Sequence, residues 1–531
     1  AGYKYDECSA EALMSRMSVK NGRLVLPDGM SYRLLILPNE SRLMTPAPVK
    51  KIKQLVAAGA TVFGPRPTAS PSLSDYSKCD EEVAQLSAEI WGDCDGKTVT
   101  EHAFGKGRVI WGQPLEDVLN KLQTPPDFTS SVKLNWIHRQ VDDTQIYFVA
   151  NEGASAVEAQ CCFRVKGLRP ELWNPKTGKI SSLAMYDETN GTISIPLRLE
   201  ESGSTFVAFR QPAKRFDPVV DFTRNGRPVV QLTQPPTIKI QTATYGVPGD
   251  AARTRDVAAK LQAMIHSGIT DFRVAQLAEG DDPAYGIVKT LVVNYTIDGD
   301  PRQASGKDPE EINLVKSRTT PERAAEIRCG ANGKMSLVAH APGQYQLKSA
   351  DGTVRQVEIA SVPAPQEITG PWEVHFPPKW GAPPEITLDH LISLSDSPIA
   401  GVKYFSGTAT YSKTFNWNPA SNPGNQKTEC WLDLGDVQVM AHVTLNGRDL
   451  GILWKPPFRC NVTGALKSGR NTLEIRVADL WPNRMIGDAA LPESKRFTWS
   501  SYEPFTQDSP LPKSGLLGPV NILAAQTAEI P

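Results

Sequence analysis

The sequence lacks the charge and hydropathy patterns that mark nucleic-acid-binding and membrane proteins. Its 57 Lys and Arg side chains are balanced by 58 Asp and Glu side chains, which leaves a net charge of −1. A polyanion is held by an excess of basic charge, so this near-balance argues against nucleic acid as a partner. No apolar run approaches the ~20 residues of a transmembrane helix, so no membrane span is expected.

Motifs for redox, zinc and nucleotide chemistry are also missing. The eight cysteines are scattered, without a C-x-x-C pair or a Cys/His cluster, which argues against a dithiol or zinc site. Most are expected to be free or buried thiols, and a Cys79–Cys94 disulfide is left open. Cys161 and Cys162 adjoin in an expected strand, so their side chains should face opposite sides. No G-x-G-x-x-G turn follows a strand, so no nucleotide site is indicated.

The first residues lack the features of a chain start. There is no initiator Met, and residues 1–5 show neither the basic nor the apolar segment of an export signal. We therefore expect the chain to begin inside a longer protein, with any export signal further upstream. The 531 residues exceed what one hydrophobic core organises and predict roughly three to five domains. The 11 Trp and 43 Pro residues suit β-rich, sugar-facing proteins, although they suit any β-sandwich.

Residues 1–125 predict an α/β domain of flavodoxin-like type. Short apolar runs alternate with segments whose apolar residues recur at helical spacing, which predicts a small parallel sheet covered on both faces. Strands are expected at 32–37, 61–63 and 107–111, and helices at 46–58, 80–91 and 115–122.

The rest of the chain predicts mostly β structure in three further domains. Residues 126–212 alternate with a period of two and predict a small β-sandwich. Residues 213–362 predict a β-domain with an inserted α+β module at about 236–315. In that module we expect a helix at 251–266, capped by Asp250, a strand at 288–295, and a polar, turn-rich run at 300–320.

Residues 363–531 predict a jelly-roll β-sandwich of galactose-binding-like type. Many short alternating segments are separated by turn signals, and this pattern favours two packed sheets. Asn446-Gly447 is a strong hairpin signal. The fold expected overall is therefore multidomain and mostly β, with one N-terminal α/β domain.

Several stretches resemble family 106 glycoside hydrolases, which are α-L-rhamnosidase-like enzymes. The resemblance covers roughly residues 1–212 and 325–531, in the order expected for the part of the family that follows its catalytic barrel. The 236–315 module resembles small modules attached to other polysaccharide-active bacterial proteins. The matching stretches are GRLVLPDGMSY at 22–32, WIHR at 136–139, IYFVAN at 146–151, GPW at 370–372, LWKPPF at 453–458, LWPNRMIGD at 480–488 and SGLLGP at 514–519.

The resemblance implies hydrolysis of terminal α-L-rhamnosyl linkages with inversion, by two carboxylates on an upstream (β/α)₈ barrel. A barrel takes about 250 residues of repeated strand–helix units, and only the first 125 residues here alternate in that way. The catalytic residues are therefore expected upstream, outside these residues. The resemblance also implies a bound calcium in the full enzyme, no cofactor in this chain, a rhamnose-containing glycan as substrate, packing against the chain's own barrel, and export to an extracytoplasmic compartment.

Eight side chains are candidates for carbohydrate binding. A flat aromatic ring can stack on the C–H face of a sugar, and amide, ammonium or guanidinium groups can satisfy its hydroxyls. For each candidate the alternative is a structural role: the two residues at 138–139 should face opposite ways on a strand, and Arg484 is spaced to pair with Asp488. The candidates are His138, Arg139, Trp454, Lys455, Trp481, Asn483, Arg484 and Trp499.

Acidic pairs in turns are weak catalytic candidates, because Asp in a turn commonly serves the backbone. Asp142-Asp143 and Asp281-Asp282 are of this kind, and Glu310-Glu311 lies in a polar surface run. Glu493 and Glu503 instead flank Trp499 in an aromatic segment that could border a neighbouring barrel. Three functions stay open from sequence: accessory domains of a rhamnosidase, a stand-alone carbohydrate-binding protein, and a purely structural assembly.

Overall fold

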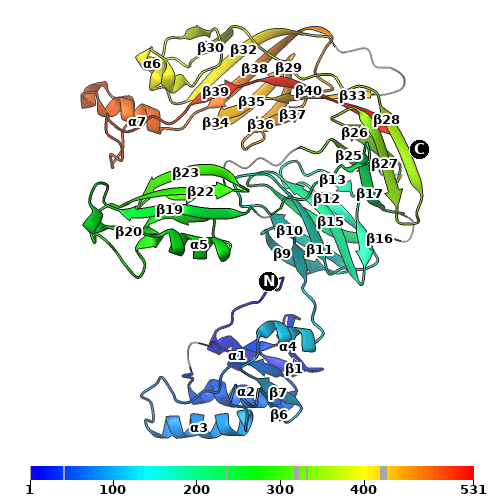
Figure 1. Ribbon diagram of the computed structural model, residues 1–531, viewed down its shortest axis with the longest axis vertical. Helices are drawn as coiled ribbons and strands as arrows, with labels where there is room; N and C mark the ends of the chain where they lie inside the picture. The colour runs from blue at the N-terminus through cyan, green and yellow to red at the C-terminus, as the bar shows by residue number, and fades with distance from the viewer. Residues whose placement is uncertain are drawn as a thin grey trace. The chain divides into compact units, whose positions relative to one another are not determined.

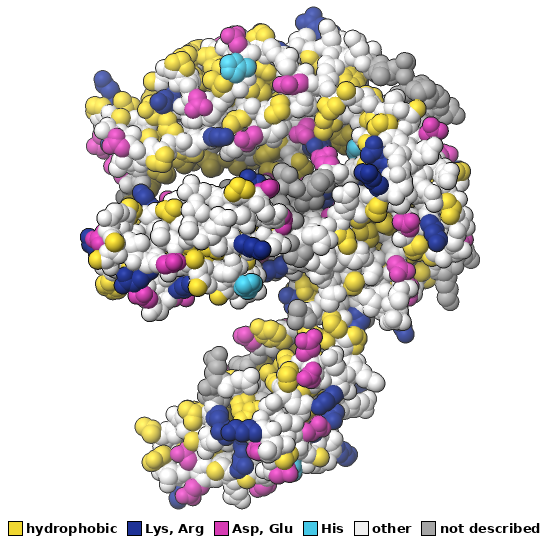
Figure 2. All heavy atoms as spheres, viewed as in Figure 1, with side chains coloured by type: hydrophobic (Ala, Val, Ile, Leu, Met, Phe, Trp, Pro, Cys, Tyr) yellow, Lys and Arg dark blue, Asp and Glu magenta, His cyan; other side chains and the backbone are white. Residues whose placement is uncertain are grey.

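The computed structural model describes residues 2–39, 42–213, 216–234, 236–315, 322–330, 333–418 and 427–531. The chain divides into two compact units, Ala1–Phe128 and Thr129–Pro531, and the fold is mostly β with several sheets, as predicted (Figure 1). No helix in the described ranges is long and apolar enough to cross a membrane. Basic and acidic side chains are interspersed over the visible face of each unit (Figure 2), as the balanced composition predicts.

The first unit combines a four-stranded sheet with helices on both of its faces. The sheet order is β4-β5-β7-β6, in which β4, β5 and β7 are parallel and β6 is an antiparallel edge strand. A separate small sheet has the order β1-β2-β3. The elements are α1 (Ala10–Arg16), β1 (Ser18–Lys20), β2 (Arg23–Val25), β3 (Ser31–Tyr32), β4 (Leu35–Ile36), α2 (Pro46–Ala58), β5 (Thr61–Phe63), α3 (Lys78–Trp91), β6 (Glu101–Phe104), β7 (Gly107–Ile110) and α4 (Leu115–Lys121).

Side-chain alternation along the strands explains this arrangement. Val62 and Val109 belong to the core under α2 and α3, whereas Phe63 and Ile110 pack with Val118 of α4. The predicted helix at 46–58 is confirmed at both ends. The strand predicted at 32–37 is wrong as one element, because its first residue pairs with β2 and its later residues pair with β5.

One hydrogen-bonded sheet runs through the second unit. Its order is β37-β33-β40-β26-β25-β13-β12-β16-β10-β9, with β29 also paired to β40. The sheet thus takes strands from all three β-domains that the sequence predicts. These strands are β9 (Asn135–Val141), β10 (Thr144–Ala150), β12 (Leu168–Trp173), β13 (Ile180–Ser182), β16 (Ser204–Pro212), β25 (Ala325–Cys329), β26 (Met335–Ala339), β29 (Gln366–Glu367), β33 (Lys427–Asp433), β37 (Arg459–Asn461) and β40 (Asn521–Glu529).

Further sheets pack over the two ends of this long sheet. At one end Tyr147 and Phe209 meet Phe163 of the sheet β14-β15-β11-β8 through aromatic contacts. At the other end a six-stranded sheet, β31-β30-β32-β38-β35-β36, shares one apolar core with β33 and β40. The added strands are β8 (Phe128–Ser130), β11 (Val157–Phe163), β14 (Asp187–Thr189), β15 (Thr192–Leu199), β30 (Trp372–His375), β31 (Glu385–Leu388), β32 (Thr408–Trp417), β35 (Met440–Leu445), β36 (Arg448–Leu453) and β38 (Gly469–Ala478).

Two smaller sheets complete the parts of the second unit used below. One has the order β18-β17-β27-β28, and the other is the pair β34-β39. Their strands are β17 (Val219–Arg224), β18 (Arg227–Pro228), β27 (Gly343–Ser349), β28 (Val354–Ile359), β34 (Asp436–Gln438) and β39 (Gly515–Gly518).

The inserted module corrects two predictions. The helix expected at 251–266 begins only with α5 (Ala258–His266), because residues 254–256 form strand β20 and pair with β19. The run at 300–307, expected to be turn-rich, is strand β23, which pairs with β22 along its whole length; residues 316–320 of that run lie outside the described residues. Tertiary pairing overrode local propensity in both places. The module's sheet has the order β20-β19-β22-β23, from β19 (Ile238–Gly246), β20 (Thr254–Asp256), β22 (Thr290–Ile297) and β23 (Asp300–Lys307).

All eight cysteines are free thiols in the structure, so the Cys79–Cys94 disulfide is not formed. Cys161 is fully buried, while Cys162 on the opposite face contacts the Ser194 hydroxyl at 3.2 Å, as the strand alternation predicts.

Candidate carbohydrate-binding site

The segment after β38 holds four of the eight candidate residues. Residues 363–531 are predicted to form a β-sandwich, and the helix α7 (Pro482–Ala489, orange in Figure 1) corrects that prediction. Pro482 lies in the first turn, where a missing N–H leaves no helix hydrogen bond unmade. The buried face of α7 is mainly polar, with Asn483, Arg484 and Asp488. It therefore lacks the apolar stripe by which a helix is usually recognised.

Arg484 and Asp488 form an ion pair one helical turn apart, as their spacing predicts. Arg484 Nε lies 3.0 Å from Asp488 Oδ1, and the side chains are only 4% and 3% exposed. The contact is electrostatic, because these two atoms are not aligned as a hydrogen bond. Asp488 Oδ2 accepts hydrogen bonds from the backbone N–H of Phe497 at 3.0 Å and from that of Thr498 at 2.7 Å. The Arg484 guanidinium also lies 4.7 Å from the centre of the Phe497 ring. The pair thus ties α7 to the loop that follows it.

Aromatic side chains of this segment extend into solvent. Trp499, Tyr502 and Trp481 are 86%, 74% and 56% exposed. Trp481 meets Trp380 edge to face, with ring centres 6.0 Å apart. Large exposed aromatic side chains can mark an interaction surface. We call Trp380, Trp481, Trp499 and Tyr502 the α7 platform.

Three oxygen atoms near the start of α7 are enclosed without a hydrogen-bond partner: Asp479 Oδ2, Asn483 Oδ1 and Ser514 Oγ. The other polar side-chain atoms of Asp479 and Asn483 bind the segment at 512–515. Asp479 Oδ1 accepts from the Gly515 N–H at 2.7 Å, and Asn483 Nδ2 donates to the carbonyl of residue 512 at 2.9 Å. Unpartnered buried oxygens are uncommon in folded proteins and are usually satisfied by water or a bound group. They make this a polar site beside the α7 platform.

Burial raises the pKa of the Asp479 carboxyl to about 7, from an ordinary value of 3.8. The residue as a whole is half-buried, but its Oδ2 is fully enclosed, which is why burial dominates. The folded state therefore binds this proton more tightly than the unfolded state does. As the pH rises from about 4 to about 7, the free energy of unfolding should decrease, by an amount on the order of a few kcal/mol.

The Asp479→Asn variant should lose this pH dependence, because the amide keeps the shape of the side chain and does not titrate. Urea unfolding at pH 4.5, 6 and 8, followed for wild type and variant, measures the difference. If the free energy of unfolding changed equally with pH in wild type and variant, the effect could not be assigned to Asp479.

His138 and Arg139 face opposite ways on β9, as their adjacency predicts. The His138 ring stacks on Tyr147, with centres 3.9 Å apart, and its Nε2 lies 2.8 Å from Gln145 Oε1. Arg139 is exposed, and its guanidinium donates to the His138 carbonyl at 3.1 Å. His138 thus contributes to strand packing, and Arg139 is the accessible one of the two.

Trp454 and Lys455 follow β36. Trp454 is more than half exposed, whereas Lys455 is half-buried. The Lys455 ammonium donates to the carbonyls of Ser202 at 2.7 Å and of Glu201 at 3.3 Å, in the turn between β15 and β16. Lys455 therefore joins the six-stranded sheet's hairpin to the sandwich formed by residues 129–212. The eight candidates lie in three places: on β9, after β36, and in the α7 segment.

Comparison with known proteins gives this geometry a context. Residues 1–188 match the family model described as alpha-L-rhamnosidase, that of glycoside hydrolase family 106. The solved structure of a rhamnosidase from Novosphingobium sp. PP1Y matches 98% of this chain at 28% sequence identity, with a TM-score of 0.63.

The resemblance to glycoside hydrolase family 106 is confirmed.

Both of the proteins compared here are longer than this chain. The chain covers 36% of the Novosphingobium rhamnosidase. A curated protein of Formosa agariphila, provisionally named a beta-glucuronidase, is 30% identical over 98% of this chain and 53% of its own length. The chain thus spans about half of the curated relative that it matches.

Several residues of the candidate site were not predicted from the sequence. Trp380 lies in a turn-rich segment 101 positions before Trp481, and Ser514 lies beyond the irregular loop after α7. No local signal places either residue beside α7. Asp479 directly follows β38 and could have been noticed as a carboxyl at a strand end, but only the pairing of residues 512–515 encloses it.

Proposed function

We propose that this chain is the accessory, C-terminal region of a glycoside hydrolase that cleaves terminal α-L-rhamnosyl linkages in plant or microbial polysaccharides. The observation that carries the proposal is the near-complete match of the chain to one solved rhamnosidase, of which it accounts for about a third. The family match over residues 1–188 supports the same assignment. In this proposal the reaction proceeds with inversion, and its two carboxylates lie on an upstream barrel.

Most of the acidic residues considered as catalytic candidates make structural contacts. This supports a catalytic pair that lies outside this chain. An inverting pair needs two carboxyl groups about 6.5–9.5 Å apart with space for a water molecule between them. The contacts are Asp281 with Arg255 at 3.1 Å, Asp282 with Lys289 at 3.2 Å, Glu310 with the Lys307 N–H at 2.9 Å, Glu311 with Arg273 at 3.7 Å, and Glu503 with Arg496.

The described residues of this chain offer no carboxylate cluster for calcium. No group of three or more His, Cys, Asp or Glu side chains in the described ranges is placed to hold a metal ion. The calcium that the family resemblance implies is proposed for the longer enzyme only.

The α7 platform is proposed to border the sugar-binding cleft of the full enzyme. Trp481 and Trp499 present the ring faces that stack on C–H bonds of a pyranose. Arg484 is too deeply buried to touch a sugar and acts as a positioning residue, since its partner Asp488 holds the backbone of residues 497–498 next to Trp499. In the same proposal residues 363–531 form a jelly roll, residues 1–125 form a flavodoxin-like domain, and the enzyme is exported to the periplasm or secreted.

The test is hydrolysis of an aryl α-L-rhamnoside with calcium present. The purified chain alone is expected to show no turnover, whereas the same chain joined to the preceding residues of its gene should hydrolyse the substrate and release the inverted anomer. Turnover by the chain alone would place the carboxylates inside residues 1–531, with Glu493, Glu503 and Asp143 the first to replace. Absence of turnover in the longer protein would overturn the assignment.

The exposed aromatic groups of the α7 platform favour one second candidate, a stand-alone carbohydrate-binding protein. Retention of a rhamnose-containing glycan by the chain alone, lost in Trp499→Ala and kept in Tyr285→Ala, would support it if the longer protein had no hydrolytic activity. Tyr285 is a suitable control, since it is 94% exposed in the inserted module.

A further inference from the structure

Cys329, the last residue of β25, lies beside a guanidinium group. Arg169 of β12 donates a hydrogen bond from Nη2 to the Cys329 sulfur at 2.8 Å, and the thiol is partly exposed. Cysteines that react lie in partly exposed, positively charged surroundings of this kind. Burial instead raises the pKa of four other thiols and keeps them protonated, those of Cys94, Cys161, Cys430 and Cys460.

Three polar atoms in this region are enclosed without a hydrogen-bond partner. They are Arg169 Nε, the Tyr186 hydroxyl and Asp217 Oδ2. Tyr186 as a whole is only 3% exposed. The ring of Phe216 holds two of these side chains, because the Arg169 guanidinium lies 3.7 Å from its centre and the Tyr186 ring stacks on it with centres 6.4 Å apart. Buried polar groups are normally paired, so three unpaired ones point to a missing group.

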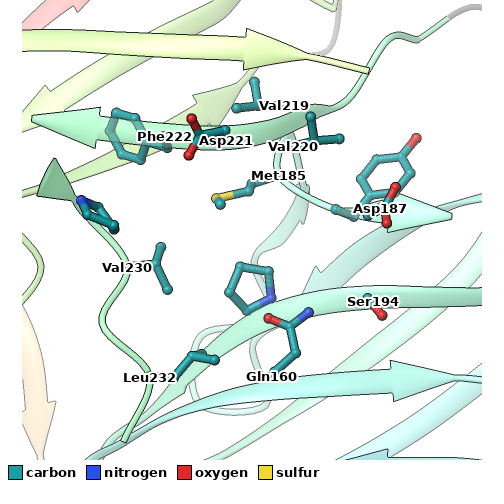
Figure 3. A pocket seen from close by; sticks show the side chains of 13 residues that line it. Gln160, Met185, Asp187, Ser194, Val219, Val220, Asp221, Phe222, Val230 and Leu232 are labelled. Carbon is teal, nitrogen blue, oxygen red and sulfur yellow. The ribbon is translucent and has the colours of Figure 1, made fainter. Parts of the chain in front are cut away.

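Electrostatic effects associate the Tyr186 hydroxyl with Cys329. Burial is the main cause that raises the pKa of Tyr186, so the phenol keeps its proton as a donor. Four neighbours also act on this pKa: Arg169 lowers it, and Glu188, Asp217 and Cys329 raise it. Tyr186 also lines an open hollow of about 220 Å³ (Figure 3), but none of these four neighbours is among its described lining residues. We call Arg169, Tyr186, Asp217 and Cys329 the Cys329 cluster.

The unpaired groups of the Cys329 cluster match the hydrogen-bonding capacity of a sulfenic acid. Arg169 Nε and the Tyr186 hydroxyl are donors, and Asp217 Oδ2 is an acceptor. The S–O–H group that forms when a thiol gains one oxygen atom has an oxygen that accepts and a hydrogen that donates. One added oxygen on Cys329 is small, so it requires no preformed pocket.

We propose that Cys329 is a site of reversible oxidation by hydrogen peroxide, whose added oxygen is bound by Arg169, Tyr186 and Asp217. The cysteine sulfur attacks one peroxide oxygen, so that an S–O bond forms as the O–O bond breaks. The sulfur is oxidised by two electrons and the peroxide is reduced. The departing oxygen takes the thiol proton and leaves as water. The Arg169 guanidinium stabilises the negative charge that develops on that oxygen. This inference goes beyond the proposed function and does not depend on it.

The experiment treats the purified chain with a small molar excess of hydrogen peroxide. Samples are quenched at intervals into urea containing dimedone, which reacts with sulfenic acids and not with thiols. Trypsin then releases Cys329 in a peptide of residues 329–334, which contains no Met, and mass spectrometry follows the adduct. Cys8 is exposed and serves as the internal control. Cys329 should form the adduct about 10-fold faster than Cys8, and dithiothreitol added before the quench should reverse the oxidation.

Variants of the two donors test the cluster. Arg169→Met should slow the oxidation of Cys329 roughly 10-fold, and Arg169→Lys, which keeps a positive charge, should restore part of the rate. Tyr186→Phe should lower the ratio of sulfenic to sulfinic acid roughly 3- to 10-fold, because the added oxygen loses one hydrogen bond. Its melting temperature should not fall, since the Tyr186 hydroxyl has no protein partner to lose.

Tyr345→Phe is the matched control for Tyr186→Phe. The Tyr345 hydroxyl is already 2.6 Å from the Ala341 carbonyl and 3.1 Å from that of Ala324, so this variant should melt at a lower temperature and leave the oxidation of Cys329 unchanged. The proposal is overturned if Cys329 forms the adduct no faster than Cys8. It is also overturned if Tyr186→Phe accumulates as much sulfenic acid as wild type does, which remains measurable even if Arg169→Met fails to fold.

Discussion

Replacing Arg484 with methionine should lower the stability of the second unit by about 3–5 kcal/mol, because it leaves the Asp488 carboxylate buried without its cation. The loss should appear first in the loop after α7, whose backbone at Phe497 and Thr498 donates to that carboxylate. Amide hydrogen exchange over residues 490–514 measures it locally. This is preferable to a single global unfolding curve, since a unit with several sheets need not unfold in two states.

A nearby ion pair provides the control for Arg484. Arg496 pairs with Glu503 in the same segment, but the Glu503 side chain is largely exposed. Arg496→Met should therefore cost less than about 1 kcal/mol. The double variant Arg484→Met/Asp488→Asn should recover part of the loss, because the amide oxygen still accepts from the loop and no lone charge stays buried. If Arg484→Met and Arg496→Met lost the same stability, the buried Arg484–Asp488 pair would have no special role.

Replacing Gly515 with alanine should destabilise the C-terminal sandwich by roughly 3 kcal/mol, through backbone strain and overpacking together. Gly515 has a φ of +88°, and a Cβ there would lie 2.3 Å from the Tyr411 hydroxyl and 2.9 Å from Leu394 Cγ. Both neighbours are fully buried and cannot move aside. The same change would displace the N–H that binds Asp479. Loss of hydrogen-exchange protection in β32 and β38 is the expected observation.

Gly447→Ala separates the two contributions to this effect. Gly447 has a φ of +79°, but a Cβ there meets nothing within 4 Å. Only the backbone strain should remain, about 1 kcal/mol. If both glycine variants lost the same stability, steric contact at Gly515 would not be the cause.

Elements set by local signals were predictable from the sequence. The helix at 46–58 begins with a proline and ends before Gly59, and Asn446-Gly447, with both φ angles positive, joins β35 to β36 as a hairpin turn should. Elements that depend on a distant partner were not. Strand β23 is almost entirely exposed and polar, and only its pairing with β22 makes it a strand.

The features of the candidate site also divide into those that local sequence predicts and those that depend on distant contacts. Trp481, Arg484 and Trp499 were found because aromatic and guanidinium groups near one another in sequence suggest sugar binding, and the pairing of Arg484 with Asp488 followed from helical spacing. The burial of Arg484 was not predictable, because it depends on Phe497 and Tyr404 folding over α7. The pocket lined by Gln160, Met185 and Asp221 (Figure 3) had no sequence signal, because its walls come from three separate segments of the chain.

The place of β40 in the long sheet bears on how the protein is made. This strand lies between β26 and β33, so both neighbours keep an open edge until it arrives. About 180 residues separate the end of β26 from the start of β40, which at about 5–20 residues per second of synthesis leaves an exposed edge for roughly 10–40 s. Unpaired strand edges promote aggregation between chains. Yield in a heterologous host should therefore depend on translation speed and on chaperones that shield nascent strands.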